Sequence, residues 1–245
     1  MSLTPELLEI NIELFNTTEN ELNWFHRKIV EIQPDAFKNC RHRKLRSLRL
    51  ESTFVMEGGI YEIAPAIYIP YISFNKIHSS LFEPLEEHLE ELKLNIRLEC
   101  EFNFLEHLQN LKKLVLKYSN FRIGKPVFKH ANNQLTHLDL SECSLIISDN
   151  TMFNDLKCLK HLDLSRVRFD DNVLPDLFSE LKQLDTLKMN NTFNLGVNAF
   201  IHLKNLRELH LQDVYIPEWC TKILAPLKRL EKLIMGSSSE SCSRK

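Results

Sequence analysis

A six-residue leucine motif, L-x-x-L-x-L, recurs along most of this 245-residue chain and limits the folds that the chain can adopt. Its unambiguous copies are LRSLRL at 45–50, LEELKL at 89–94, LKKLVL at 111–116, LTHLDL at 135–140, LKHLDL at 159–164, LDTLKM at 184–189, LRELHL at 206–211 and LEKLIM at 230–235. A less regular copy, IYIPYI at 67–72, makes every step between consecutive starts 22 to 25 residues long. One such unit cannot bury its leucines alone, so this spacing predicts a solenoid of stacked repeats.

The alternation inside the motif predicts one short strand in each repeat. Because strand side chains point alternately to opposite faces, motif positions 1, 4 and 6 are expected in the core, and positions 3 and 5 are expected to face outward. Stacked repeats pair such strands in parallel, about 4.8 Å apart, and their leucine rows then form one continuous core.

A second periodic residue supports the same register. A phenylalanine lies in the back half of several repeats, at Phe37 in the segment KIVEIQPDAFKN (28–39) and at Phe82, Phe128, Phe153, Phe178 and Phe200. Together with the leucine motifs, this pattern resembles the leucine-rich repeat (LRR) family, and in particular the typical-class repeats of extracellular LRR receptors and secreted LRR proteins. The resemblance implies an α/β solenoid: a leucine-rich repeat horseshoe of about 9–10 repeats, with a concave parallel β-sheet and short helical, 3-10 or irregular convex segments.

The chain departs from the LRR frame at position 9, which is usually Asn or Cys. The residues there are Thr53, Asn75, Arg97, Ser119, Cys143, Val167, Thr192 and Val214. We expect Cys143 to be buried in its turn. Valine offers no side-chain partner to loop backbone groups, so we expect locally irregular turns at Val167 and Val214.

We divide the chain into three parts. Residues 1–44 contain LLEINIEL (7–14) and IVEIQPDAF (29–37), which we interpret as an N-terminal cap with one or two degenerate repeats. Residues 45–235 carry the clear leucine-rich repeats. Residues 236–245 show no apolar period, and we expect a flexible tail there.

Composition and motifs favour binding over catalysis. The net charge of −2 and the absence of a basic stripe at the outward positions argue against nucleic acid as a partner. No apolar run approaches the roughly 18 residues that span a bilayer, so we expect no membrane insertion. The chain contains only five Gly and lacks phosphate-loop, nucleophile-elbow and zinc-hydrolase motifs; we expect a non-enzymatic protein without a cofactor.

One constellation permits a metal site, but we do not assign one. His137 with Asp139, and His161 with Asp163, occupy equivalent outward positions of neighbouring repeats, and these side chains could approach one ion. His and Asp are also ordinary residues at the outward positions of a repeat strand, and the cluster contains no Cys. We therefore interpret all four as solvated residues of the outward face.

The partner is expected to be a protein bound on the concave face. The outward apolar side chains concentrate early in the array, and we predict that they form the contact surface. The predicted anchors are Tyr68, Tyr71, Phe74 and Tyr118, with Ile69 and Val115 between them and Arg49, Lys93 and Lys113 as a charged rim. The alternative is a packing irregularity. Pro70 removes a ladder donor, and a slip of one residue would turn the tyrosines toward the core.

Two features of the sequence bear on the compartment in which the protein acts. The Phe-bearing repeats favour an extracellular or secreted recognition domain. The alternative is a cytoplasmic LRR adaptor, such as the substrate-recognition part of a ubiquitin ligase, favoured by the absence of a signal-peptide pattern and of paired-cysteine caps. Six Cys show no pairing pattern, although Cys220 and Cys242 could close the C-terminal end. Two sequons, at Asn16 and Asn190, would be glycan acceptors in a secretory context.

Overall fold

The computed structural model describes the greater part of the chain. The described residues are 2–3, 21–26, 31–32, 35–40, 44–52, 79–95, 102–117, 128, 134–143, 146–147, 149–169, 176–192, 195–196, 198–214 and 221–236.

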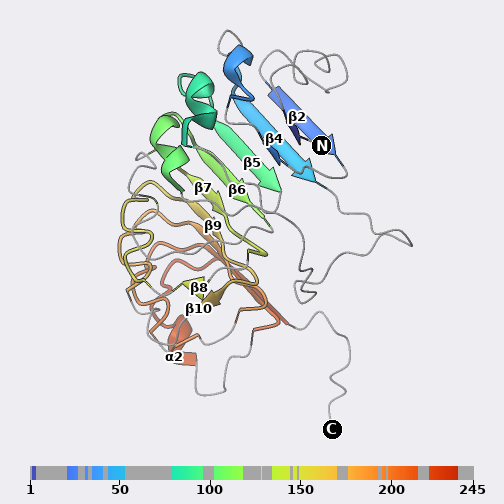
Figure 1. The fold of residues 1–245 in the computed structure, drawn as a ribbon. Helices are drawn as coiled ribbons and strands as arrows, with labels where there is room; N and C mark the ends of the chain where they lie inside the picture. The colour runs from blue at the N-terminus through green and yellow to red at the C-terminus, as the bar shows by residue number, and fades with distance from the viewer. Residues whose placement is uncertain are drawn as a thin grey trace, which may run out of the picture.

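One parallel sheet of nine strands runs through the described residues (Figure 1). Its strands follow the chain order: β2 (Glu21–His26), β4 (Ser47–Ser52), β5 (Glu91–Asn95), β6 (Lys113–Leu116), β7 (His137–Asp139), β9 (His161–Asp163), β11 (Thr186–Lys188), β12 (Glu208–Gln212) and β13 (Lys232–Gly236). Each strand pairs in parallel with the next. This arrangement confirms the predicted solenoid with a parallel concave sheet.

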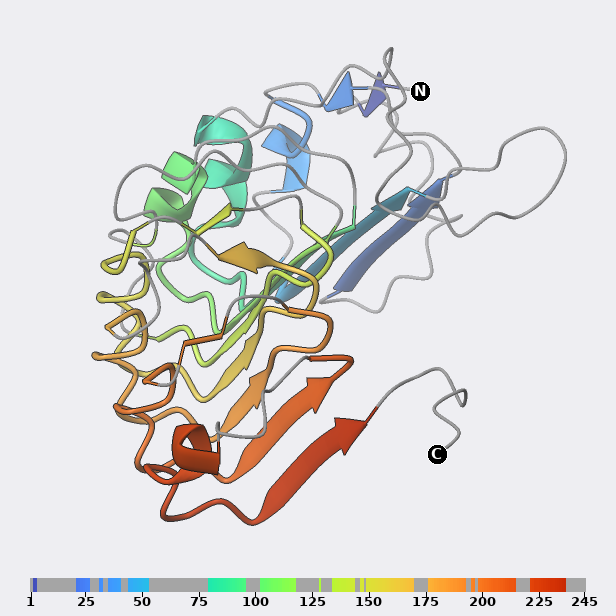
Figure 2. The ribbon, with the colours of Figure 1, turned by 90° about the horizontal axis from the view of Figure 1, so that it is seen from below.

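The remaining elements are short. The segments η1 (Lys38–Cys40), η2 (Ser79–Leu85), η3 (Phe102–His107) and α2 (Thr221–Leu224) lie on the side of their coils opposite the sheet, and turns occupy this side in the coils between η3 and α2 (Figure 2). Two small parallel pairs join β1 (Ser2–Leu3) to β3 (Glu31–Ile32) and β8 (Ile146–Ile147) to β10 (Arg168–Phe169).

The strand register places equivalent motif leucines beside one another. Leu114 of β6 is aligned with Leu138 of β7, and Leu138 with Leu162 of β9. These leucines are buried, while the residues on either side of Leu138 and Leu162 are half-buried. The predicted alternation of core and outward positions is therefore confirmed on β7 and β9, and β5 and the first four residues of β12 show it too.

The periodic phenylalanines form a second column inside the coils. All six are buried, and rings from successive repeats stack: centroids lie 5.9 Å apart for Phe37 and Phe82, 6.0 Å for Phe128 and Phe153, and 6.4 Å for Phe153 and Phe178. Six coils thus contribute leucines under the sheet and one ring under the convex segment, while Leu105 and Ile223 are buried in the convex part of two other coils.

One predicted strand is wrong. Strand β4 pairs directly with β5, with Ser47 opposite Glu91, so residues 67–72 do not lie between them in the sheet. Residues 67–72 lie outside the described residues. The ninth strand is instead β2, in the region we interpreted as degenerate repeats. The physical reasons are that Pro70 has no N–H for a ladder and that IYIPYI offers no leucine row to continue the core.

The turns that follow the strands are more regular than we predicted from the residues at motif position 9. Four residues at motif position 8, Glu142, Arg166, Asn191 and Asp213, have φ of 62°, 64°, 54° and 57°. The N–H of Arg166 donates to the carbonyl of Asn190 at 2.8 Å, as that of Glu142 does to Ser165 at 2.9 Å. This ladder continues past the strands and needs no position-9 side chain, so the expected irregularity at Val167 and Val214 is wrong.

Position 9 is nevertheless used where its side chain is polar. Cys143 is buried as predicted, and its Sγ donates to the carbonyl of Leu116 at 3.0 Å. The hydroxyl of the buried Thr192 donates to the carbonyl of Met189 at 2.7 Å. Val167 simply packs in the core.

Candidate recognition surface on the concave sheet

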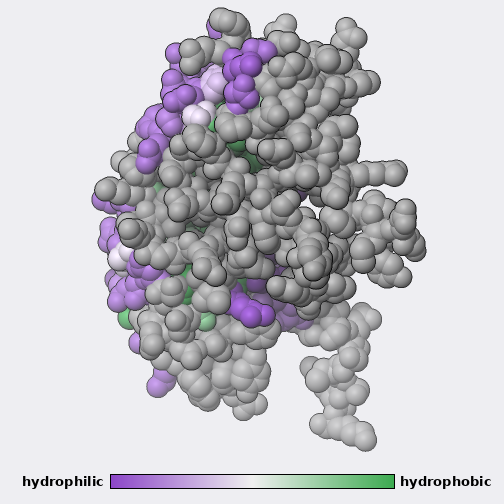
Figure 3. Space-filling model, viewed as in Figure 1, coloured by the Kyte–Doolittle hydropathy of each residue, from purple (hydrophilic) through white to green (hydrophobic). Residues whose placement is uncertain are grey.

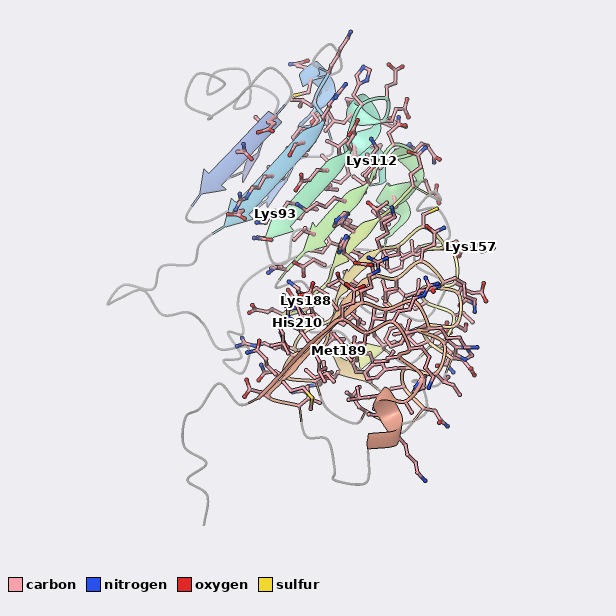
Figure 4. All side chains as sticks on the ribbon, turned by 180° about the vertical axis from the view of Figure 1, so that it is seen from behind. Lys93, Lys112, Lys157, Lys188, Met189 and His210 are labelled. Atoms are coloured by element: carbon pink, nitrogen blue, oxygen red, sulfur yellow. The ribbon has the colours of Figure 1, made fainter. Side chains whose placement is uncertain are left out.

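The outward motif positions line up across the strands and form the concave face. Positions 3 and 5 place there Ser47, Arg49, Glu91, Lys93, Lys113, Val115, His137, Asp139, His161, Asp163, Thr186, Lys188, Glu208, His210, Lys232 and Ile234. In Figure 4, Lys93, Lys188 and His210 lie along the strands, while Lys112 and Lys157 lie on the side of the connecting segments. Charges of both signs are mixed along this face.

A carboxylate on β4 organises the N-terminal part of the face. Oε1 of Glu51 accepts hydrogen bonds from Nε of Arg49 at 2.8 Å and from Nδ2 of Asn95 at 2.7 Å, and Nζ of Lys93 lies 3.0 Å away. Burial raises the pKa of Glu51, but the hydrogen bonds from Arg49 and Lys93 outweigh it and lower the pKa below its usual value. Arg49, Glu51 and Lys93 therefore form one ionised cluster that spans β4 and β5.

The predicted rim residues lie on this face, each already in an ion pair. Arg49 and Lys93 share Glu51, and Nζ of Lys113 lies 2.7 Å from Oε1 of Glu91. Pairs of this kind at a half-exposed surface contribute about 0–1 kcal/mol each. Their value to a partner is orientation more than affinity.

The predicted apolar contact residues are placed less favourably than the charged rim. Val115 is on β6 at an outward position, yet it is only 6% exposed, because neighbouring side chains cover it. Tyr68, Ile69, Tyr71, Phe74 and Tyr118 lie outside the described residues. Their role stays a prediction, but the idea that residues 67–72 lie in the sheet between β4 and β5 is wrong.

Two imidazole rings stack at the middle of the sheet. His137 of β7 and His161 of β9 are register partners, and their ring centroids lie 4.1 Å apart with the planes inclined by 19°. Oγ1 of Thr136 lies 2.8 Å from Nδ1 of His137. Burial, and then the neighbouring His161, lower the pKa of His137. The neutral form of His137 is therefore favoured, and the stacked pair presents aromatic surface on the concave face.

Two aspartates lie beside the histidines. Oδ1 of Asp139 accepts the N–H of Ser141 at 2.9 Å, and Oδ1 of Asp163 accepts the N–H of Ser165 at 3.0 Å. Burial raises the pKa of Asp163, with the negative charge of Asp139 adding to the effect. Both carboxylates are held in fixed orientations by the backbone two residues ahead.

Lys117 supplies the positive charge next to these carboxylates. Its Nζ lies 3.5 Å from Oδ2 of Asp139. Burial lowers the pKa of Lys117, but Asp139, Asp163 and Glu142 outweigh it and raise the pKa above its ordinary value. We call Lys117, His137, Asp139, His161 and Asp163 together the histidine–aspartate surface.

The described residues contain no group of side chains suited to bind a metal ion. No group of three or more His, Cys, Asp or Glu within them is arranged to hold an ion. At the histidine–aspartate surface the reason is geometric: the two rings meet face to face, and one oxygen of each aspartate is bonded to backbone.

A further ion cluster joins the last two strands. Oε1 of Glu208 lies 2.6 Å from Nζ of Lys232 and 2.7 Å from Nε2 of His210. These two hydrogen bonds lower the pKa of Glu208 to about 2. The sequence placed His137 and His161 at equivalent positions of neighbouring repeats but did not predict that their rings stack, and it did not reveal the Glu208 cluster. The available signal is that residues one repeat apart in the motif are neighbours across two strands.

Comparisons with known proteins agree with this architecture. No family model matches the chain. An alignment of 122 positions that covers 45% of the chain is 35% identical to Toll-like receptor 9 of Felis catus and covers 12% of that protein. The structure superposes on the Toll–Spatzle complex of Drosophila with a TM-score of 0.61 at 17% identity, covering 89% of this chain and 26% of that one. It also superposes on a TLR13–ssRNA13 complex with a TM-score of 0.60 at 18% identity, covering 89% of this chain and 31% of that one.

The chain is a leucine-rich repeat solenoid. The segment that it shares with the matched Toll-like receptor is a small part of that protein's length. Among the described residues of the LRR solenoid, no helix is long and apolar enough to span a bilayer. The described side chains visible along the convex side in Figure 3 are mostly hydrophilic.

Proposed function

We propose that this LRR solenoid is a non-catalytic recognition module that binds a protein partner on its concave face. The observation that carries the proposal is the row of fixed side chains of mixed charge along the sheet, with two stacked imidazoles at its centre. A mosaic of both signs suits a protein surface, whereas a phosphate backbone favours one basic stripe.

The histidine–aspartate surface is the centre of the proposed site. Its rings are half-buried and stacked, so little side-chain entropy remains to be lost on binding. Its aspartates are already oriented by backbone N–H groups, which makes them preorganised acceptors for a partner's donors. The N-terminal patch of Tyr68, Ile69, Tyr71, Phe74, Val115 and Tyr118 is the competing location.

The solved structures with this fold support ligand binding of two kinds. One is named as a complex of Toll with Spatzle and another as a complex of TLR13 with ssRNA. Because one of these complexes contains RNA, the comparisons give no support to our expectation that the partner is not a nucleic acid. The proposal remains a protein partner, and single-stranded RNA becomes an arm of the test.

The test measures the dissociation constant of a partner, selected from a displayed library of secreted and cytosolic proteins, for matched variants. His161→Ala and His137→Ala should each weaken binding about 30-fold, the equivalent of an anchor worth about 2 kcal/mol. Ile201→Ala on the convex side is the control, because Ile201 is exposed and far from the sheet's outward positions.

Three other outcomes would move the binding site or refute the proposal. Sensitivity to Tyr71→Ala and Tyr118→Ala without sensitivity to His161→Ala would move the site to the N-terminal patch. Tight, salt-dependent binding of a single-stranded RNA oligonucleotide with no protein selected would refute a protein partner. Loss of binding in Ile201→Ala alone would refute the concave face.

We also propose an extracellular or secreted location, with a cytoplasmic adaptor as the alternative. The support is the typical-class phenylalanine column and the partial match to a Toll-like receptor. The chain contains six Cys, so the number of reactive thiols reports whether any of them are paired. Counting thiols in denaturant after secretion from cultured cells should give four if one pair forms; six would favour the cytoplasm.

A further inference from the structure

Asp163 differs from the other carboxylates described on the concave face because it has no cation bound to it. Glu51, Glu91, Asp139 and Glu208 each lie within 3.5 Å of a lysine Nζ. Asp163 occupies the outward position 5 of β9, and within the part of the chain that the structure describes it forms no ion pair. One carboxylate at the centre of the sheet is therefore left without a counter-ion.

Burial makes the missing counter-ion costly. Burial raises the pKa of Asp163, and the negative charge of Asp139 adds to the rise. The hydrogen bonds from Ser165 and the charge of Lys188, the register partner on β11, offset only part of this effect. A buried carboxylate is stabilised when a cation and further donors approach it. Because the described residues supply no such cation, a bound partner is the available source.

The surroundings of Asp163 suit a flat cation that carries several donors. The N–H of Ser165 donates to Oδ1 of Asp163 at 3.0 Å, and a carboxylate has about four acceptor sites, so capacity for further donors remains. His161 lies two residues earlier on the same strand, and residues i and i+2 share one face. The ring of His161 is half-buried and held by its stack on His137, so it presents a fixed aromatic surface beside the carboxylate.

An unpaired hydroxyl in the same surface is a second, independent sign of a missing ligand group. Ser141 occupies motif position 7, directly after β7, and its N–H donates to Oδ1 of Asp139. Position 7 lies on the same side as position 5, because Glu51 at position 7 bonds to Arg49 at position 5. Ser141 is only 4% exposed, and its Oγ has no hydrogen-bond partner among the described residues. The floor of the histidine–aspartate surface thus contains an unused polar group as well as an unneutralised charge.

We propose that the histidine–aspartate surface binds an arginine side chain of a protein partner, with the guanidinium stacked on His161 and hydrogen-bonded to Asp163. This proposal rests on the proposed function, since the arginine belongs to the protein that is bound on the concave face. A guanidinium is planar, always charged and carries five donors, so one group can cover the ring and bond to the carboxylate. The neutral form of His137 is favoured, so its ring does not repel the cation.

Arginine fits this surface better than lysine does. An ammonium group is a compact point charge that is strongly hydrated and has no flat face to lie on an imidazole ring. It would neutralise Asp163 but would leave the surface of His161 uncovered. The site is therefore expected to prefer arginine over lysine, and either cation over a neutral side chain.

The first experiment compares peptide selections on two forms of the protein. A displayed library of short random peptides is selected in parallel on the native chain and on Asp163→Asn. Arginine should be enriched among peptides that bind the native chain, and the enrichment should disappear with Asp163→Asn. An asparagine oxygen can still accept the N–H of Ser165, so circular dichroism should show an unchanged fold. Glu91→Gln is the matched control, because Lys113 already neutralises that carboxylate, and it should keep the enrichment.

The second experiment measures the coupling between Asp163 and the peptide's arginine by titration calorimetry. Citrulline keeps the size of arginine and removes its charge. In the best selected peptide, this replacement should weaken binding to the native chain at least about tenfold, and binding to Asp163→Asn by less than about twofold. Lysine should recover only part of the loss. His161→Ala should abolish the advantage of arginine over lysine, whereas Glu91→Gln should leave the effect of citrulline unchanged.

The outcomes separate this proposal from the proposed function. A native chain that selects no arginine-containing peptide overturns the arginine site, as does an equal effect of citrulline on the native chain and on Asp163→Asn. If binding is lost with His161→Ala while the arginine and citrulline peptides bind equally, the arginine site is refuted and the concave recognition face stands. If binding is lost with Ile201→Ala on the convex side and is insensitive to His161→Ala, the proposed function itself is refuted.

Discussion

The phenylalanine column makes a quantitative prediction about stability. Phe153 is fully buried and stacks with two rings, Phe128 at 6.0 Å and Phe178 at 6.4 Å. Phe200 is equally buried, but no stacked ring is found for it among the described residues. Truncating a buried Phe to Ala costs about 3–5 kcal/mol of unfolding free energy through lost burial and the remaining cavity. Each stacked pair adds about 0.5–1.5 kcal/mol beyond its buried area.

Phe153→Ala should therefore cost about 1–3 kcal/mol more than Phe200→Ala, since it breaks two ring pairs. Urea unfolding followed by circular dichroism measures both, and hydrogen exchange of β7, β9 and β11 shows whether the loss is local, as expected in a solenoid. Ile201→Ala, at 41% exposure, should change stability by less than about 0.5 kcal/mol. Equal costs for Phe153→Ala and Phe200→Ala would show that ring stacking contributes nothing and refute the reasoning.

Three further predictions test the register, the turns and the ion clusters. Leu162→Asp should unfold much of the domain in chemical denaturation by burying an unpaired charge, whereas Asp163→Asn should leave stability at pH 7 unchanged or higher. The pKa of Asp163 is raised by burial, so its folded charged form is penalised at neutral pH. Arg166→Val should cost about 1–2 kcal/mol in thermal unfolding, because a β-branched residue resists the positive φ there, while Arg166→Asn should be nearly neutral. Since the folded pKa of Glu208 is lowered to about 2, its contribution is present above its unfolded value of 4.5 and is lost as pH falls toward 2; Glu208→Gln should flatten stability over that window.

The strands could be predicted where local and global signals agree. A motif with leucine at positions 1, 4 and 6 specifies both the strand and its buried face, so eight strands were found from spacing alone. Strand β2 was missed because only Leu22 and Trp24 occupy core positions of its unit, and Glu19 replaces the first leucine. The false copy at 67–72 fitted because the starts at 45 and 89 are two repeat lengths apart.

The site could be predicted only in part, because sequence gives the face of a residue but not its neighbours. Arg49, Lys93 and Lys113 were correctly placed outward, yet their pairing with Glu51 and Glu91 depends on which strands are adjacent. Val115 has the outward position but not the exposure. The histidines were considered as metal ligands, and the parallel register instead brings their rings face to face.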